Sequence, residues 1–345
     1  MSYKDDMKDG YEDIPVDQSK DLLSMNDPSK HKGDLVNETN KIKIGIVGHG
    51  FVGSAVDYAF THPFVDKFIV DPIKYDTTID DLIEYQPFIT FICAPTPMGD
   101  DGNIDASIVE DATLKLMEDT EGLVVIKSTI TPEVIDRLSN SVYDDDVDRL
   151  VYNPEFLTES SSKEQFVMAP YHILGGLPRA TSEVTKIYKL FSLCTTDKYV
   201  EMSAPEAAFV KYGVNTFLAT KVTFFNQLYD AVTDFGCNWP SIANAIGLDS
   251  RIGQGHTRVP GFDGKRGFGG ACFPKDLKAF YKFDENRLTL LAEIGRINDN
   301  YRKKYELDDR EKSNNVNYDS DLSSDEFELG DADVDNGQTK EELED

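Results

Sequence analysis

The sequence predicts an α/β protein in which a doubly wound, mostly parallel sheet is followed by an α-helical domain. Short apolar runs alternate with helical stretches through the first half of the chain, as they do in βαβ units. The first of these runs leads directly into a glycine-rich turn. Between about Pro205 and Phe235, apolar residues recur at the spacing of a helix, so we expect the second half to be helical.

The glycine turn has the pattern G-x-G-x-x-G and lies between the apolar run 42–47 and a helix-like stretch. Gly48 permits the tight turn, Gly50 lets the backbone approach a pyrophosphate, and Gly53 allows close packing of the helix. The N-terminus of that helix attracts the phosphate charge. The pattern therefore predicts a Rossmann-like dinucleotide site with cofactor contacts at Gly48, Gly50, Phe51, Val52 and Gly53.

A second apolar run ends in Asp71, eighteen positions after Gly53. A carboxylate at this place accepts both ribose hydroxyls of a dinucleotide and repels a 2′-phosphate, so NAD is favoured over NADP. A second interpretation is open, in which Asp71 is only a turn residue before Pro72. The cofactor we expect is NAD.

Two further strand-like runs, 88–93 and 123–127, each end in a polar loop. In doubly wound sheets such loops lie at the carboxyl edge, where ligands bind. We therefore expect Pro95 and Thr96 to contact the cofactor. Thr129, after the second run, either donates to a ligand or caps the helix that follows.

Two pairs of polar residues have the spacing of one helical turn. Glu155 and Glu159, if helical, share a face and can position a water or raise one another's pKa; the alternative is a solvated acidic turn. Lys211 and Asn215 interrupt an apolar neighbourhood of the long helix. Lys211 either extends outward to solvent or is a retained catalytic ammonium beside Asn215.

Cys272 stands where the glycine-rich loop 267–270 becomes a helix. Backbone N–H groups and the helix dipole stabilise an anion there, and a cysteine pKa near ~8.5 can fall to roughly 3.5–7.5. Pro274 suits the first turn, where its missing N–H costs nothing. Asp276 follows one turn later on the same face. The alternative is a small buried cysteine after a glycine turn.

Seven motifs, in their order along the chain, resemble those of the UDP-glucose/GDP-mannose dehydrogenase family. They are Gly48-x-Gly50-Phe51-Val52-Gly53, Pro95-Thr96-Pro97, Ser128-Thr129, Asn153-Pro154-Glu155-Phe156-Leu157, Lys211-x-x-x-Asn215, Arg251-Ile252-Gly253 and the segment from Gly267 to Asp276. The resemblance covers approximately residues 42 to 304. Such a combination in the correct order is highly specific.

The resemblance implies an NAD-dependent, four-electron oxidation of a nucleotide sugar, with UDP-glucose giving UDP-glucuronate as the expected case. Cys272 would be the nucleophile that carries a thiohemiacetal and then a thioester. By the same matching, Lys211 and Asn215 would stabilise oxyanions, and Asp276 would hold a water that takes part in proton transfer.

The remaining roles also come from the resemblance. Glu155 and Glu159 would assist proton movement and thioester hydrolysis, and Thr129 would orient water. Substrate contacts are expected at Phe156, Leu157, Arg251, Phe268 and Gly269. Because the matching arginine reaches substrate across a subunit interface, a homodimer is implied, with the helical domain as its dimerisation domain.

Two other functions compete with this one. A two-electron β-hydroxyacid dehydrogenase is similar in having a Rossmann domain followed by a helical domain with a Lys-x-x-x-Asn pair, but it needs no thiol nucleophile at Cys272. A non-catalytic NAD-binding protein is the second alternative. The joint retention of Lys211, Asn215, Cys272 and Asp276 argues against it.

The expected organisation has four parts: an N-terminal tail (1–40), the NAD-binding domain (41–200), the helical domain with the cysteine loop (201–305) and an acidic tail (306–345). Family members carry a third domain where we expect the acidic tail. Its absence would leave the grip on the nucleotide unexplained. The loop before the glycine run is longer than usual, and Lys265 and Arg266 there are either a diphosphate clamp or solvated.

The amino-acid composition further limits the classes of function that this chain can have. A formal net charge of -28 argues against binding to nucleic acid, which requires clustered Lys and Arg. No apolar run reaches the roughly 18 residues of a membrane span, and the N-terminus lacks a signal-peptide core, so a cytoplasmic location is expected. The four cysteines are far apart without a C-x-x-C pair, which suggests neither a disulfide framework nor a metal site.

Overall fold

The computed structural model describes residues 41–141, 147–158 and 161–318. The chain divides into two compact units. The described part of the first unit comprises residues 41–96 and 106–208, and that of the second comprises 97–105 and 209–318. The first unit thus ends at Ala208, close to the expected boundary at 200.

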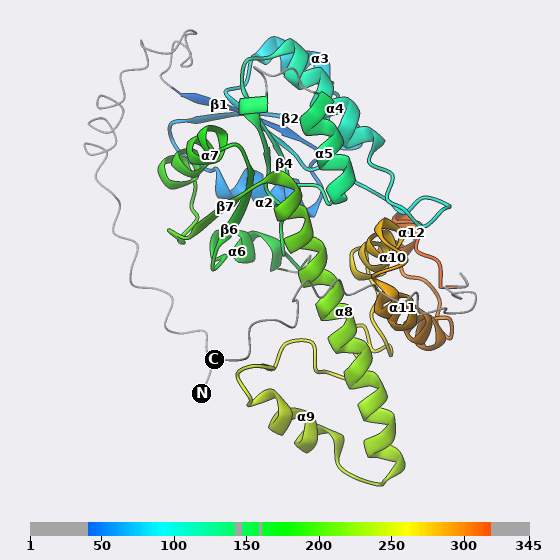
Figure 1. Ribbon diagram of the computed structural model, residues 1–345. Helices are drawn as coiled ribbons and strands as arrows, with labels where there is room; N and C mark the ends of the chain where they lie inside the picture. The colour runs from blue at the N-terminus through cyan, green and yellow to red at the C-terminus, as the bar shows by residue number, and fades with distance from the viewer. Residues whose placement is uncertain (1–40, 142–146, 159–160, 319–345) are drawn as a thin grey trace, which may run out of the picture. The chain divides into compact units, whose positions relative to one another are not determined.

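The first unit is built on a seven-stranded sheet with the order β2-β1-β3-β4-β5-β6-β7 (Figure 1). Its strands are β1 (Ile42–Val47), β2 (Val65–Val70), β3 (Ile89–Ile92), β4 (Leu123–Ile126), β5 (Leu150–Tyr152), β6 (His172–Gly176) and β7 (Tyr199–Met202). The first five run parallel, whereas β6 is antiparallel to β5 and parallel to β7. The predicted doubly wound sheet is confirmed, with its last two strands reversed.

Helices cover both faces of this sheet. They are α2 (Phe51–Ala59), α3 (Ile79–Tyr85), α4 (Ser107–Asp119), α5 (Pro132–Ser141), α6 (Ser162–Val167) and α7 (Pro178–Phe191), with the short 3-10 helix η2 (Val147–Arg149). Helices α2, α6 and α7 pack in one core cluster with the strands, while α3, α4 and α5 lie over the other face (Figure 1). Strand residues such as Ile44, Phe91 and Val125 are fully buried between these layers, as expected for parallel strands.

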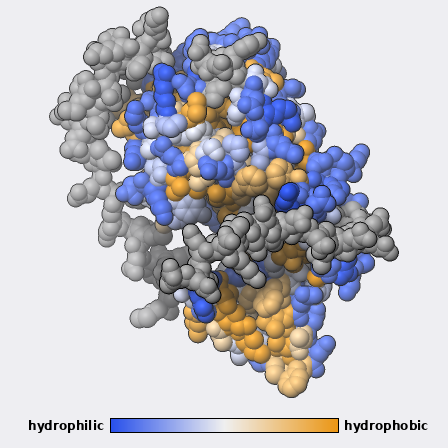
Figure 2. All heavy atoms as spheres, viewed as in Figure 1, coloured by the Kyte–Doolittle hydropathy of each residue, from blue (hydrophilic) through white to orange (hydrophobic). Residues whose placement is uncertain are grey.

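The second unit is helical, as predicted. It contains most of α8 (Ala204–Asp234), then α9 (Trp239–Gly247), α10 (Phe273–Phe283), α11 (Thr289–Arg302) and α12 (Asp309–Ser313). One core cluster joins α8, α10 and α11. Apolar side chains also lie uncovered on this unit, among them Phe217 and Phe224 on α8 at 67% and 56% exposure. Figure 2 shows apolar residues gathered over the far end of α8 and over α9, at the bottom of the view.

The acidic tail does not begin at residue 306, and this part of the expectation is wrong. Residues 306–318 continue the second unit, with α12 opened by a capping box from Asp308. Glu311 is completely buried, and Val316 and Tyr318 are 3% and 6% exposed. These side chains give the segment an anchor that overall composition does not reveal. Residues 1–40 and 319–345 lie outside the described residues.

None of the helices described here has both the length and the apolar character that crossing a bilayer requires. The cytoplasmic location stays a prediction.

Candidate active site

The glycine turn after β1 forms a cradle with one open position. A side chain on Gly48, which has φ +85°, would come within 2.7 Å of the Cys93 carbonyl oxygen, and one on Gly53 would lie 1.9 Å from the Gly48 carbonyl. A Cβ on Gly50 would meet nothing within 4 Å. Gly50 also precedes α2 and has no side chain to cap it. The open position therefore lies at a helix N-terminus, where a dinucleotide pyrophosphate fits.

Asp71 is tied to this turn. Its Oδ2 accepts the backbone N–H of His49 at 2.7 Å, and its Oδ1 accepts those of Ile73 and Lys74 at 3.0 and 3.1 Å. Burial alone would raise the pKa of Asp71, but these three donors hold it below the ordinary value. The carboxylate is thus both a turn residue and a fixed negative charge beside the cradle, as NAD recognition requires.

Other predicted cofactor residues lie in loops at the carboxyl edge of the parallel strands. Thr96, after β3, is 5% exposed and Pro95 is exposed. The Ser128 hydroxyl after β4 donates to the Ala94 carbonyl at 2.7 Å and so joins the two loops. The expected cap of α5 comes from Thr131, whose Oγ1 accepts the Val134 N–H at 3.4 Å, and not from Thr129. A role of Thr129 toward a ligand stays a prediction.

A buried polar network fixes the start of segment 153–158 after β5. The Lys127 ammonium donates to the backbone carbonyl and to Oδ1 of Asn153 at 3.1 and 3.0 Å. The Tyr188 hydroxyl donates to the same Oδ1 at 2.7 Å, and Nδ2 of Asn153 donates to the Ile173 carbonyl at 2.8 Å. Sequence reasoning missed Lys127 and Tyr188, because their partner lies 26 and 35 residues away.

Glu155 does not lie on a helix, because residues 153–158 are not helical. Glu155 is 7% exposed, and its Oε2 accepts the Leu157 N–H at 2.6 Å. Glu159 lies outside the described residues. A pocket of about 470 Å³ opens beside this segment. Residues from three stretches of the first unit line it, including Lys127, Glu155, Phe156, Leu157, Tyr171 and His172.

In the second unit, α8 and α10 bring together four polar side chains in an apolar surrounding. Lys211 is 2% and Asn215 6% exposed, so the interpretation of Lys211 as extending to solvent is wrong. Nδ2 of Asn215 donates to Oδ2 of Asp276 at 2.6 Å across 61 residues of sequence. The Lys275 ammonium donates to the other oxygen, Oδ1, at 2.6 Å. Both oxygens of the fully buried Asp276 are therefore held in place.

The structure adds Lys275 to the predicted site residues of the second unit. Neighbouring residues on a helix normally point apart, so helical spacing does not predict the ion pair between Lys275 and Asp276. The local signal for this pair is the presence of two adjacent opposite charges, Lys275 and Asp276, in the first turn of α10.

Cys272 is the N-cap residue of α10, with Pro274 in the first turn as predicted. The Asp276 N–H donates to the Cys272 carbonyl at 2.9 Å, the first hydrogen bond of the helix. The Cys272 side chain is partly buried and makes no disulfide. A thiolate at this position lies beside the N–H groups of the first helical turn, which favour its charge.

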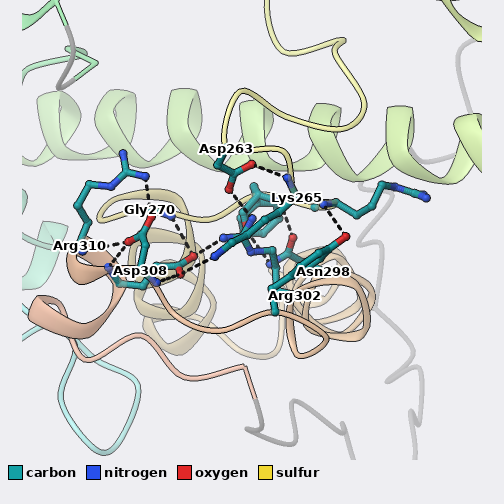
Figure 3. A network of polar contacts seen from close by, with 12 residues as sticks. Asp263, Lys265, Gly270, Asn298, Arg302, Asp308 and Arg310 are labelled. Atoms are coloured by element: carbon teal, nitrogen blue, oxygen red, sulfur yellow. Dashed lines mark hydrogen bonds and ion pairs between the residues drawn. The ribbon is translucent and has the colours of Figure 1, made fainter.

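Three backbone N–H groups of the glycine loop before Cys272 donate to side chains from three separate segments. Gly267 donates to Oδ1 of Asn226 at 3.0 Å, Phe268 to Oδ1 of Asn298 at 2.7 Å, and Gly270 to Oε1 of Glu311 at 3.3 Å. Figure 3 shows Gly270, Asn298 and Arg302 in this network. The loop that presents Phe268, Gly269 and Cys272 is thus held from α8, α11 and α12.

The remaining predicted residues differ in exposure. Arg251 is exposed and pairs with the adjacent Asp249, its Nη2 lying 2.6 Å from Oδ2. Arg266 is not solvated: it donates to Asn226 and Asp230 and stacks between the rings of two tyrosines. The Lys265 ammonium donates to the Glu306 carbonyl at 2.6 Å. Both cations of the long loop therefore have partners within their own unit.

A glycine cradle with a fixed carboxylate beside it, together with a thiol and a buried Lys, Asn and Asp set on helices, is typical of a dinucleotide-dependent dehydrogenase. Comparison with known protein families supports this class. Residues 71–192 match the UDP-glucose/GDP-mannose dehydrogenase family, NAD binding domain, and residues 205–300 match its central domain. The chain belongs to the UDP-glucose/GDP-mannose dehydrogenase family, and its cofactor is NAD.

Several relatives of this chain share the name UDP-glucose 6-dehydrogenase. UDP-glucose 6-dehydrogenase AglM of Haloferax volcanii is 32% identical over 230 residues, which cover 62% of this chain and 52% of that protein. UDP-glucose 6-dehydrogenase of Rickettsia felis is 35% identical over 204 residues, 57% of this chain and 43% of that one. A solved UDP-glucose dehydrogenase from Pyrobaculum islandicum gives a TM-score of 0.65 at 25% identity, covering 78% and 70% of the two chains. The chain spans about half the length of the curated relatives it matches.

Proposed function

We propose that this protein oxidises the primary alcohol of a nucleotide sugar to a carboxylate with two molecules of NAD, and that UDP-glucose is the substrate. The observation that carries the proposal is Cys272 at the N-terminus of α10, one turn before a carboxylate anchored by Asn215 and Lys275. A β-hydroxyacid dehydrogenase does not need such a thiol. The names of the relatives supply the substrate.

The reaction proceeds in two oxidations with a covalent stage between them. Bound NAD supplies the acceptor for one hydride in each oxidation. After the alcohol has become an aldehyde, the Cys272 thiolate adds to its carbonyl carbon and forms a thiohemiacetal. Loss of the second hydride gives a thioester, and attack by water releases the carboxylate and restores the thiol. One alcohol, one water and two NAD yield one carboxylate, two NADH and three protons.

The buried groups of the second unit have defined tasks in this scheme. The Lys211 ammonium and the Asn215 amide stabilise the oxygen that becomes negative when the thiolate adds. Asp276 orients a water for proton transfer, since its own position is fixed by two hydrogen bonds. In the first unit, Glu155, Glu159 and Thr129 assist proton movement and the hydrolysis of the thioester.

Substrate contacts are proposed at Phe156 and Leu157, which line the pocket of the first unit, and at Phe268 and Gly269 of the glycine loop. Arg251 is assigned to the substrate of a second subunit. Its 87% exposed side chain is consistent with that role.

A homodimer is part of the proposal. Phe217 and Phe224 lie seven residues apart, on one side of α8, and both are more than half exposed. Phe235 and Leu248, beyond the ends of α8 and α9, are 86% and 80% exposed. A surface of large apolar side chains is typical of an interface. A second copy that packs along α8 would cover it.

The test is the stoichiometry of the reaction. Purified protein is incubated with NAD and a panel of nucleotide sugars, and NADH formed per sugar consumed is measured beside a Cys272→Ser variant. We expect two NADH per UDP-glucose for the native protein and loss of the second oxidation in the variant. One NADH per substrate with an unaffected variant would favour a two-electron dehydrogenase. Binding of NAD without turnover of any sugar would favour a non-catalytic protein.

A further inference from the structure

We propose that residues 306–318 form a C-terminal strap that positions the glycine loop before Cys272, and that Glu311 is its positioning residue. The inference rests on the proposed function in so far as Cys272 is the nucleophile. It assigns a task to a segment that lies beyond the matched family domains, which end at residue 300.

The strap is attached to the rest of the second unit along its whole length. Its first residue, Glu306, accepts the Lys265 ammonium through its carbonyl. Further along, the Asn314 carbonyl accepts the Met98 N–H at 3.1 Å, and the Asn315 amide donates back to the Met98 carbonyl at 3.1 Å. The Asn317 carbonyl accepts the ammonium of Lys278 on α10. The strap thus contacts the helix that begins beside Cys272.

Glu311 lies at the centre of these contacts. Its Oε1 accepts the Arg302 guanidinium, the Tyr318 hydroxyl at 2.7 Å and the Gly270 N–H at 3.3 Å. Its Oε2 accepts the Asp308 N–H at 2.8 Å. Burial alone would raise the pKa of Glu311, but these donors hold it below its ordinary value. The carboxylate is therefore charged, buried and bonded to the loop two residues before Cys272.

Arg302 links the strap to the segment that precedes the glycine loop. Its Nη1 lies 2.7 Å from Oδ2 of Asp263 (Figure 3), while its Nη2 contacts Glu311. A side chain on Gly269 would come within 2.1 Å of Arg302 and 2.4 Å of Glu311. The loop backbone is thus pressed against this ion pair, and only glycine fits at residue 269.

The arrangement explains why the loop needs the strap. Asn226 and Asn298 hold Gly267 and Phe268, but among the described residues only Glu311 accepts the N–H of Gly270. Removing Glu311 would leave Arg302 buried with one carboxylate partner in place of two and Gly270 without its acceptor. A buried guanidinium and a buried N–H that lack hydrogen-bond acceptors are destabilising, so we expect the loop to shift until water can hydrate them.

The experiment compares Glu311→Ala with Glu311→Gln in the full chain. Both remove the charge, but glutamine keeps an oxygen that can accept the Gly270 N–H. Two readouts do not need turnover: hydrogen exchange of the loop amides, and the rate at which iodoacetamide alkylates Cys272. A Cys237→Ser background removes the exposed cysteine, and Cys93 and Cys194 react slowly because burial raises both pKa values.

We expect faster exchange of the peptide that contains Gly270 in Glu311→Ala, and alkylation at least fivefold slower than in Glu311→Gln. The alkylation slows because a displaced thiol loses the N–H groups of the helix N-terminus. Glu311→Gln should stay within about threefold of the native alkylation rate. If the two variants exchange and react alike, the strap does not position the loop.

Turnover is measured separately on the same proteins. If the native protein makes no NADH from any nucleotide sugar, the proposed function fails, while the exchange and alkylation data still decide the role of the strap. If it does turn over, we expect kcat to fall at least tenfold in Glu311→Ala. A loosened loop with an unchanged kcat and KM would overturn the catalytic side of the proposal.

Discussion

Asp276 is fully buried, and Asn215 and Lys275 hold its two carboxylate oxygens. Breaking a buried ion pair from one side leaves an uncompensated charge, which costs roughly 3–5 kcal/mol. We therefore expect Asp276→Asn to lower the free energy of unfolding by about 3 kcal/mol in urea titrations. Adding Lys275→Met should restore more than half of the loss. A double variant as unstable as the single one would contradict the pairing.

Asp71 presents a fixed carboxylate beside the phosphate cradle. Asp71→Asn keeps an acceptor for the turn but loses the charge that favours ribose hydroxyls over a 2′-phosphate. We expect the dissociation constant for NAD to rise at least tenfold, and the preference for NAD over NADP to narrow, in calorimetric titrations. An unchanged affinity for both cofactors would assign Asp71 to the turn alone.

His172 makes stability depend on pH. Burial, with the charge of Lys127 adding to it, lowers the pKa of His172 to about 3. The unfolded chain binds the proton near its ordinary pKa of about 6.5, so stability falls as pH drops from about 6.5 toward 3.

His172→Phe suits a site ringed by Phe166, Tyr188 and Tyr199 and removes this titration. Between pH 7 and pH 5, His172 should account for about 2 kcal/mol of the lost unfolding free energy. The test is urea unfolding at both pH values. Equal losses in native and variant protein would exclude His172 as the source.

At the scale of single residues, the sequence predicted those positions that depend only on local backbone geometry. The helix N-terminal position of Cys272 and the position of Asp71 in the turn after β2 follow from short patterns. Sequence reasoning failed where two interacting residues are far apart in the sequence, or where their spacing is not one that brings side chains together on a helix. Lys127 contacts Asn153 across 26 residues, and Lys275 pairs with its immediate neighbour.

Helix α8 has an exposed aromatic side that the described residues of the chain leave uncovered. We expect Phe217→Asp to shift the protein to the monomer in light scattering, because a charge at an apolar interface is desolvated without a partner. Leu114→Ser, which changes an exposed apolar residue on α4, serves as the matched control. A native protein that is already monomeric, or a Phe217→Asp variant that stays dimeric, would contradict the proposed interface.

The C-terminal strap gives a prediction at the scale of elements. Truncation after Tyr318 removes no described residue and should leave the unfolding temperature within a few degrees of the native value. Truncation after Tyr305 removes Glu311, Val316 and Tyr318, which are all buried, and should lower it sharply. Thermal unfolding of both proteins is the measurement. Similar unfolding temperatures would show that the strap contributes nothing to the second unit.

The alternation of strands and helices was predictable because it repeats over many residues. The strap was not, because three buried side chains in a mostly polar segment do not change its composition. The reversal of β6 and β7 was equally hidden, since the direction of a short apolar strand leaves no trace in its own residues.

At the scale of the whole molecule, the chain contains the NAD-binding and central domains of its family and spans about half the length of its curated relatives. The groups assigned to chemistry occur in both compact units. The central proposal is therefore chemical: we propose that the chain catalyses a four-electron oxidation through a covalent bond to Cys272.

The most direct test is mass spectrometry of protein quenched with acid during turnover of UDP-glucose and NAD. The account predicts that the peptide containing Cys272 gains the mass of one nucleotide-sugar acyl group, bound as a thioester. Hydroxylamine should release the adduct, and Cys272→Ser should abolish it. NADH formation without an adduct, together with an unimpaired second oxidation in Cys272→Ser, would contradict the account.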